Sequence, residues 1–157
     1  PTQEGLTDWL KKSFQNSLRK RYHNRHTDFA RIQGSGVSNI LLRGESYPRV
    51  CFLIDTSGSM AETFVSDDGK EMSRLNYVVK QLDEVVRQHL RSDQQFNVIQ
   101  FNTSPTAWAK GLMPVTKTNV DAAVAMARTW FPTGGTNMRD GLRLAYEMPK
   151  VAAVYLL

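Results

Sequence analysis

The sequence predicts an α/β fold in which helices cover both faces of a mostly parallel, doubly wound sheet. Three observations lead to this prediction. First, the stretch RVCFLI, residues 49–54, shows no alternation of apolar and polar side chains, which is typical of a strand buried on both faces. Second, segments with helical and strand-like patterns follow one another along the chain. Third, glycine and hydroxyl residues come where a buried strand ends, as expected for the ligand-binding edge of such a sheet.

The first half of the domain is expected to contain one long helix between two buried strands. After the strand at 49–54, apolar residues recur every three or four positions, and Ser73 is suited to cap the helix that they form. The stripe consists of Leu75, Val78, Val79, Leu82, Val85, Val86 and Leu90. The acid-rich stretch VSDDGKE before it, residues 65–71, is expected to be a solvated loop. QFNVIQF, residues 95–101, is the next predicted strand.

The second half is expected to add an edge strand, two helices and a last buried strand. TAWAKGL, residues 106–112, is predicted as a short edge strand after the turn NTSP. Residues 118–131 predict a helix capped by Thr118 or Asn119, with an inward face formed by Val120, Ala123, Val124, Ala127 and Phe131. The loop PTGGTN opens a third helix over 138–148, which stops at Pro149, and KVAAVYLL, residues 150–157, is the final strand.

The N-terminal part of the chain differs from the rest in charge. The 157 residues carry a net charge of +5, and residues 1–31 contain seven Lys and Arg against three acidic residues. Leu6, Leu10, Phe14 and Leu18 recur every four positions, which predicts an amphipathic helix. We therefore assign residues 1–33 to a basic helical arm and linker and residues 34–157 to the main domain, with a further edge strand within residues 39–48. The arm is expected to dock on an acidic protein surface, and nucleic-acid binding is not favoured because no known nucleic-acid module is present.

Composition excludes several classes of protein. Hydrophobic residues make up 41% of the chain, which is enough for a packed core. No apolar run approaches the roughly 20 residues of a membrane-spanning helix, and the N-terminus lacks the apolar core of a secretory signal. The single cysteine, Cys51, lies in an apolar run, so we expect it to be buried and the compartment to be reducing.

A cluster of oxygen-bearing residues follows the first buried strand. Asp55, Ser57 and Ser59 lie at alternate positions of a turn that contains Gly58, so one carboxylate and two hydroxyl groups can face a common space. The glycines of the second loop allow a sharp path that brings Thr136 to the same edge. These are hard oxygen ligands of the kind that Mg²⁺ prefers, and no nearby Cys or His favours a softer metal. We expect Asp55, Ser57, Ser59 and Thr136 to hold Mg²⁺, or Mn²⁺ or Ca²⁺ in its place.

DTSGSM and GGTNMRDGL together resemble the von Willebrand factor type A domain with its metal-ion-dependent adhesion site. Asp55, Ser57 and Ser59 match the family's D-x-S-x-S motif, Thr136 matches its threonine, and the likeness spans residues 49–157. The resemblance implies a Rossmann-like fold and a non-enzymatic module for protein interaction and assembly. It also implies that a partner's acidic residue completes the coordination of the cation.

The sequence departs from the family's pattern at one point, and it resembles one subgroup of the family more than others. The family's third metal motif is an aspartate directly after the strand found here at 150–157, and the sequence ends before it, so the domain is expected to be incomplete at its C-terminus. YPRVCFLIDTSGSM and FNVIQFN are most similar to an intracellular subgroup, von Willebrand factor A domain-containing protein 3, with members linked to cilia. The secreted inter-alpha-trypsin inhibitor heavy chains share the Phe-Asn-x-Ile pattern. We expect an intracellular scaffold in the cytoplasm, cytoskeleton or cilium, with secretion as the alternative.

Other interpretations of the same residues stay open. Asp55 and the serines could only form a turn, and Thr136 or Asn137 could only cap a helix. The domain could then be a structural module with a vestigial metal site, using its arm and helices for contacts. As the best enzymatic alternative, Asp55 could serve as a nucleophile in phosphotransfer. Asp140 lies one turn into the third helix and is not assigned to the metal.

Overall fold

The structure, a computed structural model, describes residues 47–66 and 69–157. The arm predicted over residues 1–33, and all but the end of the edge strand predicted within 39–48, lie outside the described residues.

The centre of the molecule is a mostly parallel sheet, as the sequence predicts. β1 (Arg49–Asp55) pairs in parallel with β4 (Gln95–Phe101) on one side and with β7 (Ala153–Leu156) on the other. β5 (Pro105–Ala107) and β6 (Met113–Pro114) both pair antiparallel with β4 and form the edge. The order β5-β4-β1-β7 places β1 between two parallel neighbours, which explains its unbroken apolar sequence.

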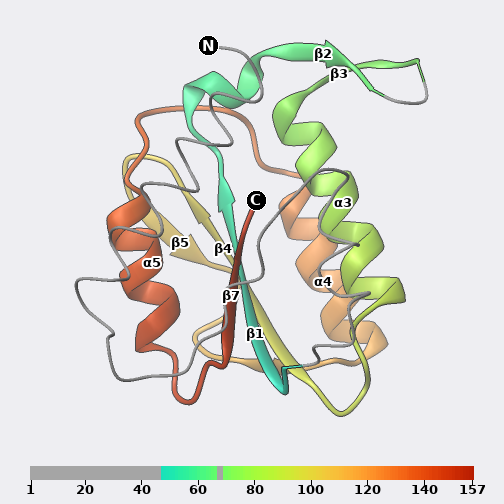
Figure 1. Cartoon of the computed structure of the whole chain (residues 1–157), viewed down its shortest axis with the longest axis vertical. Helices are drawn as coiled ribbons and strands as arrows, with labels where there is room; N and C mark the ends of the chain where they lie inside the picture. Colours follow the sequence, from blue (N-terminus) through green and yellow to red (C-terminus); the bar gives the residue numbers. More distant parts are fainter. Residues whose placement is uncertain (1–46, 67–68) are drawn as a thin grey trace.

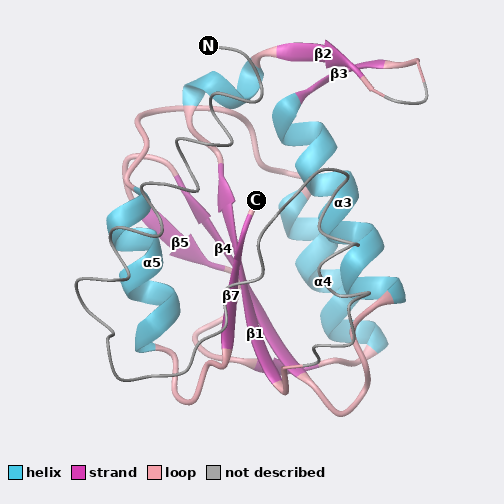
Figure 2. Ribbon diagram, in the orientation of Figure 1, coloured by secondary structure: helices cyan, strands magenta, loops and turns pink. Residues whose placement is uncertain are grey.

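Helices cover both faces of this sheet (Figure 1). α3 (Arg74–Gln88) and α4 (Lys117–Ala127) lie on one face, and α5 (Met138–Glu147) lies on the other, as Figure 2 shows in the same view. Alternate side chains of β1 divide between the two layers: Phe52 and Ile54 pack in the cluster that contains α3 and α4, and Leu53 packs in the cluster that contains α5. None of the described helices combines the length and the apolar character that crossing a bilayer requires.

The long helix begins where the sequence predicts. The Ser73 side chain accepts a hydrogen bond from the Asn76 N–H, and the helix that follows buries Leu75, Val79, Leu82, Val85 and Val86. The stretch before it is more ordered than predicted, because Thr63–Val65 (β2) and Glu71–Ser73 (β3) form an antiparallel hairpin. The prediction of a loop over all of 65–71 is therefore wrong at both ends of that stretch.

The second helix is shorter than predicted at its C-terminus. α4 is capped by Thr116, whose hydroxyl accepts from the Asn119 N–H, so the expected cap at Thr118 or Asn119 is wrong. The helix ends at Ala127, four residues before Phe131, so helical periodicity no longer decides which way Phe131 points. Phe131 is 70% exposed and not inward-facing, and Trp130 packs partly against the core beside it.

The edge strand predicted over 106–112 is wrong for most of its length, because within it only residues 106–107 belong to a strand, β5, and β6 begins after it at Met113. Buried Asn97 of β4 donates from Nδ2 to the carbonyls of Ala109 and Gly111, both at 2.8 Å. The Trp108 N–H still donates to the Val98 carbonyl of β4 at 2.8 Å, and the ladder resumes at Met113. The buried Asn97 amide is thus satisfied by carbonyls of the segment that connects the two short strands.

Candidate metal centre

The carboxyl ends of three strands meet around Asp55. Asp55 ends β1 and is half-buried, and its N–H donates to the Leu157 carbonyl at 3.1 Å, just beyond β7. The next residue, Thr56, is fully buried, and its N–H donates to the Phe101 carbonyl at the end of β4, at 2.8 Å. The site predicted from the sequence therefore begins at the edge where ligands bind in sheets of this kind.

The turn after β1 brings three of the four predicted ligands together. An oxygen of the Asp55 carboxylate accepts from the Ser57 N–H at 2.7 Å, which holds the carboxylate over the turn. The hydroxyl oxygens of Ser57 and Ser59 lie 3.2 Å apart. Ser57 is 1% exposed, whereas Ser59 is exposed in the short 3₁₀ helix η1 (Gly58–Ala61). The turn thus has a buried side and an open side.

A second loop lies directly against this turn. The Thr133 N–H donates to the Thr56 carbonyl at 2.9 Å, and the Gly58 N–H donates to the Gly134 carbonyl at 3.1 Å. Gly134 has a φ of 70°, a left-handed conformation that favours glycine. The two loops are separated by most of the domain in sequence, and these backbone bonds hold them side by side.

Thr136, the fourth predicted ligand, follows two residues later and has an exposed side chain. In the described part of the chain its hydroxyl forms no hydrogen bond with either serine. The capping role falls to Asn137, whose side-chain oxygen accepts from the Asp140 N–H at the start of α5. The Thr136 hydroxyl is therefore not used as a cap, and its contribution to a metal site stays a prediction.

The loop after β4 supports the second loop, and reasoning from the sequence misses it. The Thr103 hydroxyl accepts from the Gly135 N–H at 3.0 Å, and the Asn137 N–H donates to the Asn102 carbonyl at 2.6 Å. The Asn137 side chain also donates to the Thr103 carbonyl at 3.2 Å. A signal for this loop is nevertheless present, since parallel pairing of β1 with β4 brings residues 102–104 to the same edge as Asp55.

The chemistry of the turn fits a small hard cation. One carboxylate and two hydroxyl groups are oxygen ligands, and a magnesium ion with bonds of about 2.1 Å has neighbouring ligands about 3.0 Å apart. The 3.2 Å between the two serine oxygens is close to that separation. Within residues 47–66 and 69–157, no group of three or more His, Cys, Asp or Glu side chains is placed to hold a metal. The carboxylate of Asp140, which is not among the predicted metal ligands, accepts a hydrogen bond from Asn137 and pairs with Arg143.

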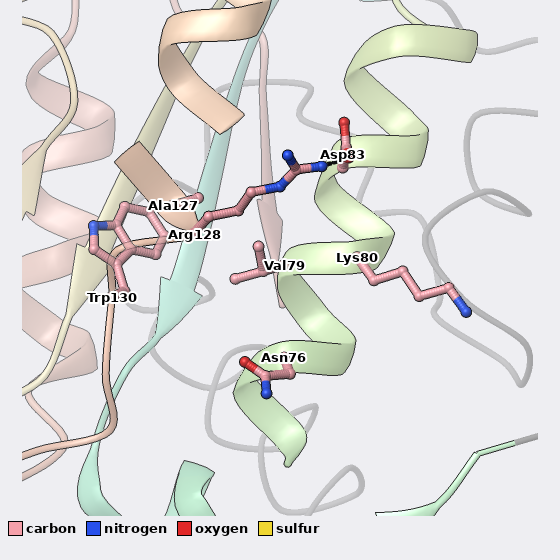
Figure 3. A pocket seen from close by; sticks show the side chains of 7 residues that line it. All are labelled: Asn76, Val79, Lys80, Asp83, Ala127, Arg128 and Trp130. Carbon is pink, nitrogen blue, oxygen red and sulfur yellow. Dashed lines mark hydrogen bonds and ion pairs between the residues drawn. The ribbon is translucent and has the colours of Figure 1, made fainter. Parts of the chain in front are cut away.

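A cleft of about 250 Å³ lies between α3 and α4 (Figure 3). The indole of Trp130 and the side chain of Val79 face each other across it, and Arg128 reaches over to Asp83, with 2.6 Å between nitrogen and oxygen. The other lining residues are Asn76, Lys80 and Ala127. Trp130 therefore lines this cleft and also begins the segment that continues to Thr133.

Comparisons with known proteins agree with this geometry. A sequence model of the von Willebrand factor type A domain matches residues 50–153. Inter-alpha-trypsin inhibitor heavy chain H4 of Homo sapiens is 32% identical over 99 residues, which make up 63% of this chain and 10% of that protein. Heavy chain H2 of Mus musculus is 32% identical over 93 residues, or 59% of this chain and 9% of that protein. The chain covers about a tenth of the length of these relatives.

Solved structures show the same fold. A von Willebrand factor type A protein from Catenulispora acidiphila superposes with a TM-score of 0.56 at 18% identity, over 69% of this chain and 25% of that one. An uncharacterized membrane spanning protein from Vibrio fischeri gives a TM-score of 0.53 at 23% identity, over 63% of this chain and 48% of that one. The likeness to the domain-containing protein 3 subgroup stays a prediction, because these comparisons do not test it.

Proposed function

Since the chain belongs to the von Willebrand factor type A domain family, we propose that it is a non-enzymatic protein-interaction module that binds its partner through a divalent cation. In this proposal Asp55, Ser57, Ser59 and Thr136 hold Mg²⁺, or Mn²⁺ or Ca²⁺, directly or through water. The observation that carries the proposal is the turn in which Asp55 and the two serines converge.

The donor set explains why an acidic partner is proposed. Asp55 brings one negative charge, whereas serine and threonine hydroxyls are neutral, so the charge of a divalent cation is only partly balanced. A bound cation would offer its open positions to oxygen ligands from outside. A carboxylate of a partner would supply both an oxygen ligand and the missing negative charge. The partner's other features are not specified by this centre alone.

The chain's own residues would keep the centre in shape. The Ser57 N–H orients the Asp55 carboxylate, and burial of Ser57 fixes the side of the turn nearest the sheet. Ser59 and Thr136 are exposed, so their hydroxyls are accessible from the side on which a partner would approach. The basic arm is proposed to dock on an acidic protein surface. A location in the cytoplasm, cytoskeleton or cilium is likewise proposed, with secretion as the alternative.

Magnesium titration tests the proposed centre. A ligand that binds only the folded state at a hundred times its dissociation constant raises the free energy of unfolding by about 2.7 kcal/mol. We expect a gain of this size for the chain on adding saturating Mg²⁺, measured by urea unfolding. Asp55→Ala is expected to abolish it. Asp55→Asn, which keeps an oxygen that can accept from the Ser57 N–H, is expected to weaken it strongly.

Asp93→Ala is a matched control for the loss of one carboxylate. Asp93 is exposed and pairs with Arg91. It lies just before β4, at the end of the parallel strands opposite to Asp55. This variant is expected to keep the full gain from Mg²⁺. Equal gains in the wild type, Asp55→Ala and Asp93→Ala would reject the centre and leave a structural module with a vestigial site.

A further inference from the structure

Phe131 is an exposed aromatic residue on the loop that leads to the candidate metal centre. It is 70% exposed, and among the described residues the one other large hydrophobic side chain with such exposure is Val65, at 69%. Single exposed apolar side chains are common on protein surfaces, so the position of Phe131 beside the candidate metal centre, and not its exposure alone, is the basis of the inference. Burying a large aromatic side chain against a partner is strongly favourable.

The backbone around Phe131 is held in place on both sides. Before it, Trp130 packs against the core, and its N–H donates to the Ala127 carbonyl at 3.2 Å. Figure 3 shows the indole of Trp130 on one side of the cleft and Arg128 extended toward Asp83. After it, the Thr133 N–H donates to the Thr56 carbonyl at 2.9 Å. The outward position of Phe131 is thus imposed by neighbours that are anchored to the domain.

The same anchor places Phe131 near the metal centre. Thr133 is two residues after Phe131, and its bonding partner Thr56 lies between Asp55 and Ser57. The connection from α4 to α5 that contains Phe131 runs along the edge of the sheet where β1 ends (Figure 1). Val65 lies instead on the β2–β3 hairpin, beyond η1.

A rigid aromatic side chain beside a polar centre has the features of a binding hot spot. The backbone that carries Phe131 is already anchored, and an aromatic side chain has only two rotatable bonds, so its burial would cost little conformational entropy. If a partner's carboxylate binds at the metal centre, the residues next to that carboxylate in the partner would lie over the loop that contains Phe131. A large apolar side chain next to the acid would cover the exposed ring.

We propose that Phe131 and the metal centre form one surface, which binds a protein segment carrying an acidic residue with a large apolar residue close to it. The acidic half of this recognition rests on the proposed function, and the apolar half rests on the exposure and anchoring of Phe131. A protein segment is proposed because a carboxylate and a large apolar side chain a few positions apart in one peptide can reach the metal centre and Phe131 together; binding to an anionic membrane is an outcome that the test separates.

A displayed peptide library tests the proposal. The probe is a set of nine-residue peptides with a fixed central aspartate and random flanking positions, selected against the chain in the presence of Mg²⁺. We expect enrichment of Leu, Ile, Phe or Trp within a few positions of the aspartate. Phe131→Ala is expected to bind the selected peptides at least tenfold more weakly and to lose the apolar preference. It should still require Mg²⁺ and the aspartate.

Val65→Ala is the matched control, because it removes a side chain of equal exposure from another part of the surface. It is expected to bind the selected peptides with wild-type affinity. Unchanged affinity in Phe131→Ala, or an equal loss in Val65→Ala, would overturn the proposal. So would the selection of no peptide, or Phe131-dependent binding to phosphatidylserine vesicles in place of peptides.

The outcomes also separate this inference from the proposed function. Binding that depends on Phe131 but persists in chelator and with an asparagine-centred peptide would uphold the apolar surface and reject the metal centre. Binding that needs Mg²⁺ and aspartate but is the same in Phe131→Ala would uphold the metal centre and reject the apolar surface.

Discussion

Gly134 controls the contact between the two loops of the candidate site. Its carbonyl accepts from Gly58, and its φ of 70° is unfavourable for residues with a side chain. A Cβ placed on Gly134 would lie 2.6 Å from the Thr103 hydroxyl oxygen, which itself accepts from the Gly135 N–H. Both the backbone conformation and the neighbouring loop therefore require glycine here.

We predict that Gly134→Ala lowers the free energy of unfolding by about 3 kcal/mol, from backbone strain of about 1–2 kcal/mol and steric overlap of similar size. Gly69→Ala is the matched control. Gly69 also has a positive φ, of 76°, but a Cβ placed on it would meet no atom within 4 Å, so Gly69→Ala should show only the backbone strain of about 1–2 kcal/mol. Equal losses for the two variants, measured by urea unfolding, would show that the contact with Thr103 does not matter.

Single residues also show where sequence reasoning is sufficient. Ser73 is predictable as a cap because serine precedes a helical apolar stripe, and a cap depends on only three or four neighbouring residues. Asp55, Ser57 and Ser59 are recognisable for the same reason, since their spacing within one turn is local. Thr103 escapes prediction because its partner, Gly135, is far along the chain.

At the scale of elements, α5 approaches the sheet closely at Gly141. A Cβ at this position would lie 3.0 Å from a methyl carbon of Leu53 and 3.2 Å from the Cβ of Phe101. Glycine inside a helix normally costs about 1 kcal/mol relative to alanine. Close packing against β1 and β4 therefore accounts for a residue that helix propensity disfavours.

We predict that Gly141→Ala destabilises the domain by about 1 kcal/mol. Overpacking of about 1–3 kcal/mol exceeds the gain in helix propensity, because the Cβ of Phe101 is fixed to the backbone and cannot move aside. Gly111→Ala is a suitable control, because its Cβ would meet no atom within 4 Å, and its stability should be close to wild type. A Gly141→Ala variant as stable as the wild type in urea would contradict this account.

The contact between α3 and α4 is reinforced by exposed ion pairs. Arg87 bonds to Asp121 and to Asp83, and Lys117 also bonds to Asp121. Hydrogen bonds from Lys117 and Arg87 hold the pKa of the Asp121 carboxyl below its usual value. Pairs of this kind are screened by salt and contribute little individually, so apolar packing of the two helices decides their position.

Periodicity predicts the start and type of each helix well and their ends less well. The apolar stripe of α4 continues past Ala127 in the sequence, which is why periodicity places Phe131 on the inward face. Past Ala127, Thr129 and Trp130 bond back to Met126 and Ala127, and Thr133 bonds to the β1 turn. Pro132, which follows Phe131, also disfavours a helix through that residue.

At the scale of the whole molecule, Cys51 is a probe of global unfolding. It lies in the central strand with no exposed surface, and burial raises the pKa of its thiol from 9.0 to about 12. A thiol in the middle of a sheet becomes accessible only when the domain opens as a whole. Its reactivity and its titration therefore both report on the folded state.

We predict that Cys51 resists alkylation at pH 8 until urea unfolds the chain. We also predict that the free energy of unfolding falls as pH rises from 9 toward 12. The unfolded chain releases the thiol proton near pH 9, whereas the folded chain retains it until about pH 12, so the contribution is complete below pH 9 and lost above it. Cys51→Ala should show a shallower decline, and an identical pH profile would contradict the prediction.

The class of fold, the central buried strand and the turn at Asp55 are predictable without coordinates, because they depend on periodicity and on residues adjacent in the chain. The sequence also predicts the strand pairs as parallel, since buried strands separated by helices pair in this way. The bonds from Thr133 and Gly134 to the turn, and the exposure of Phe131, become apparent only in the folded domain. The bonds from buried Asn97 to the carbonyls of residues 109 and 111, between the two short edge strands, are likewise absent from any pattern along the chain. These features depend on hydrogen bonds between distant segments, and a pattern read along the chain does not contain such pairings.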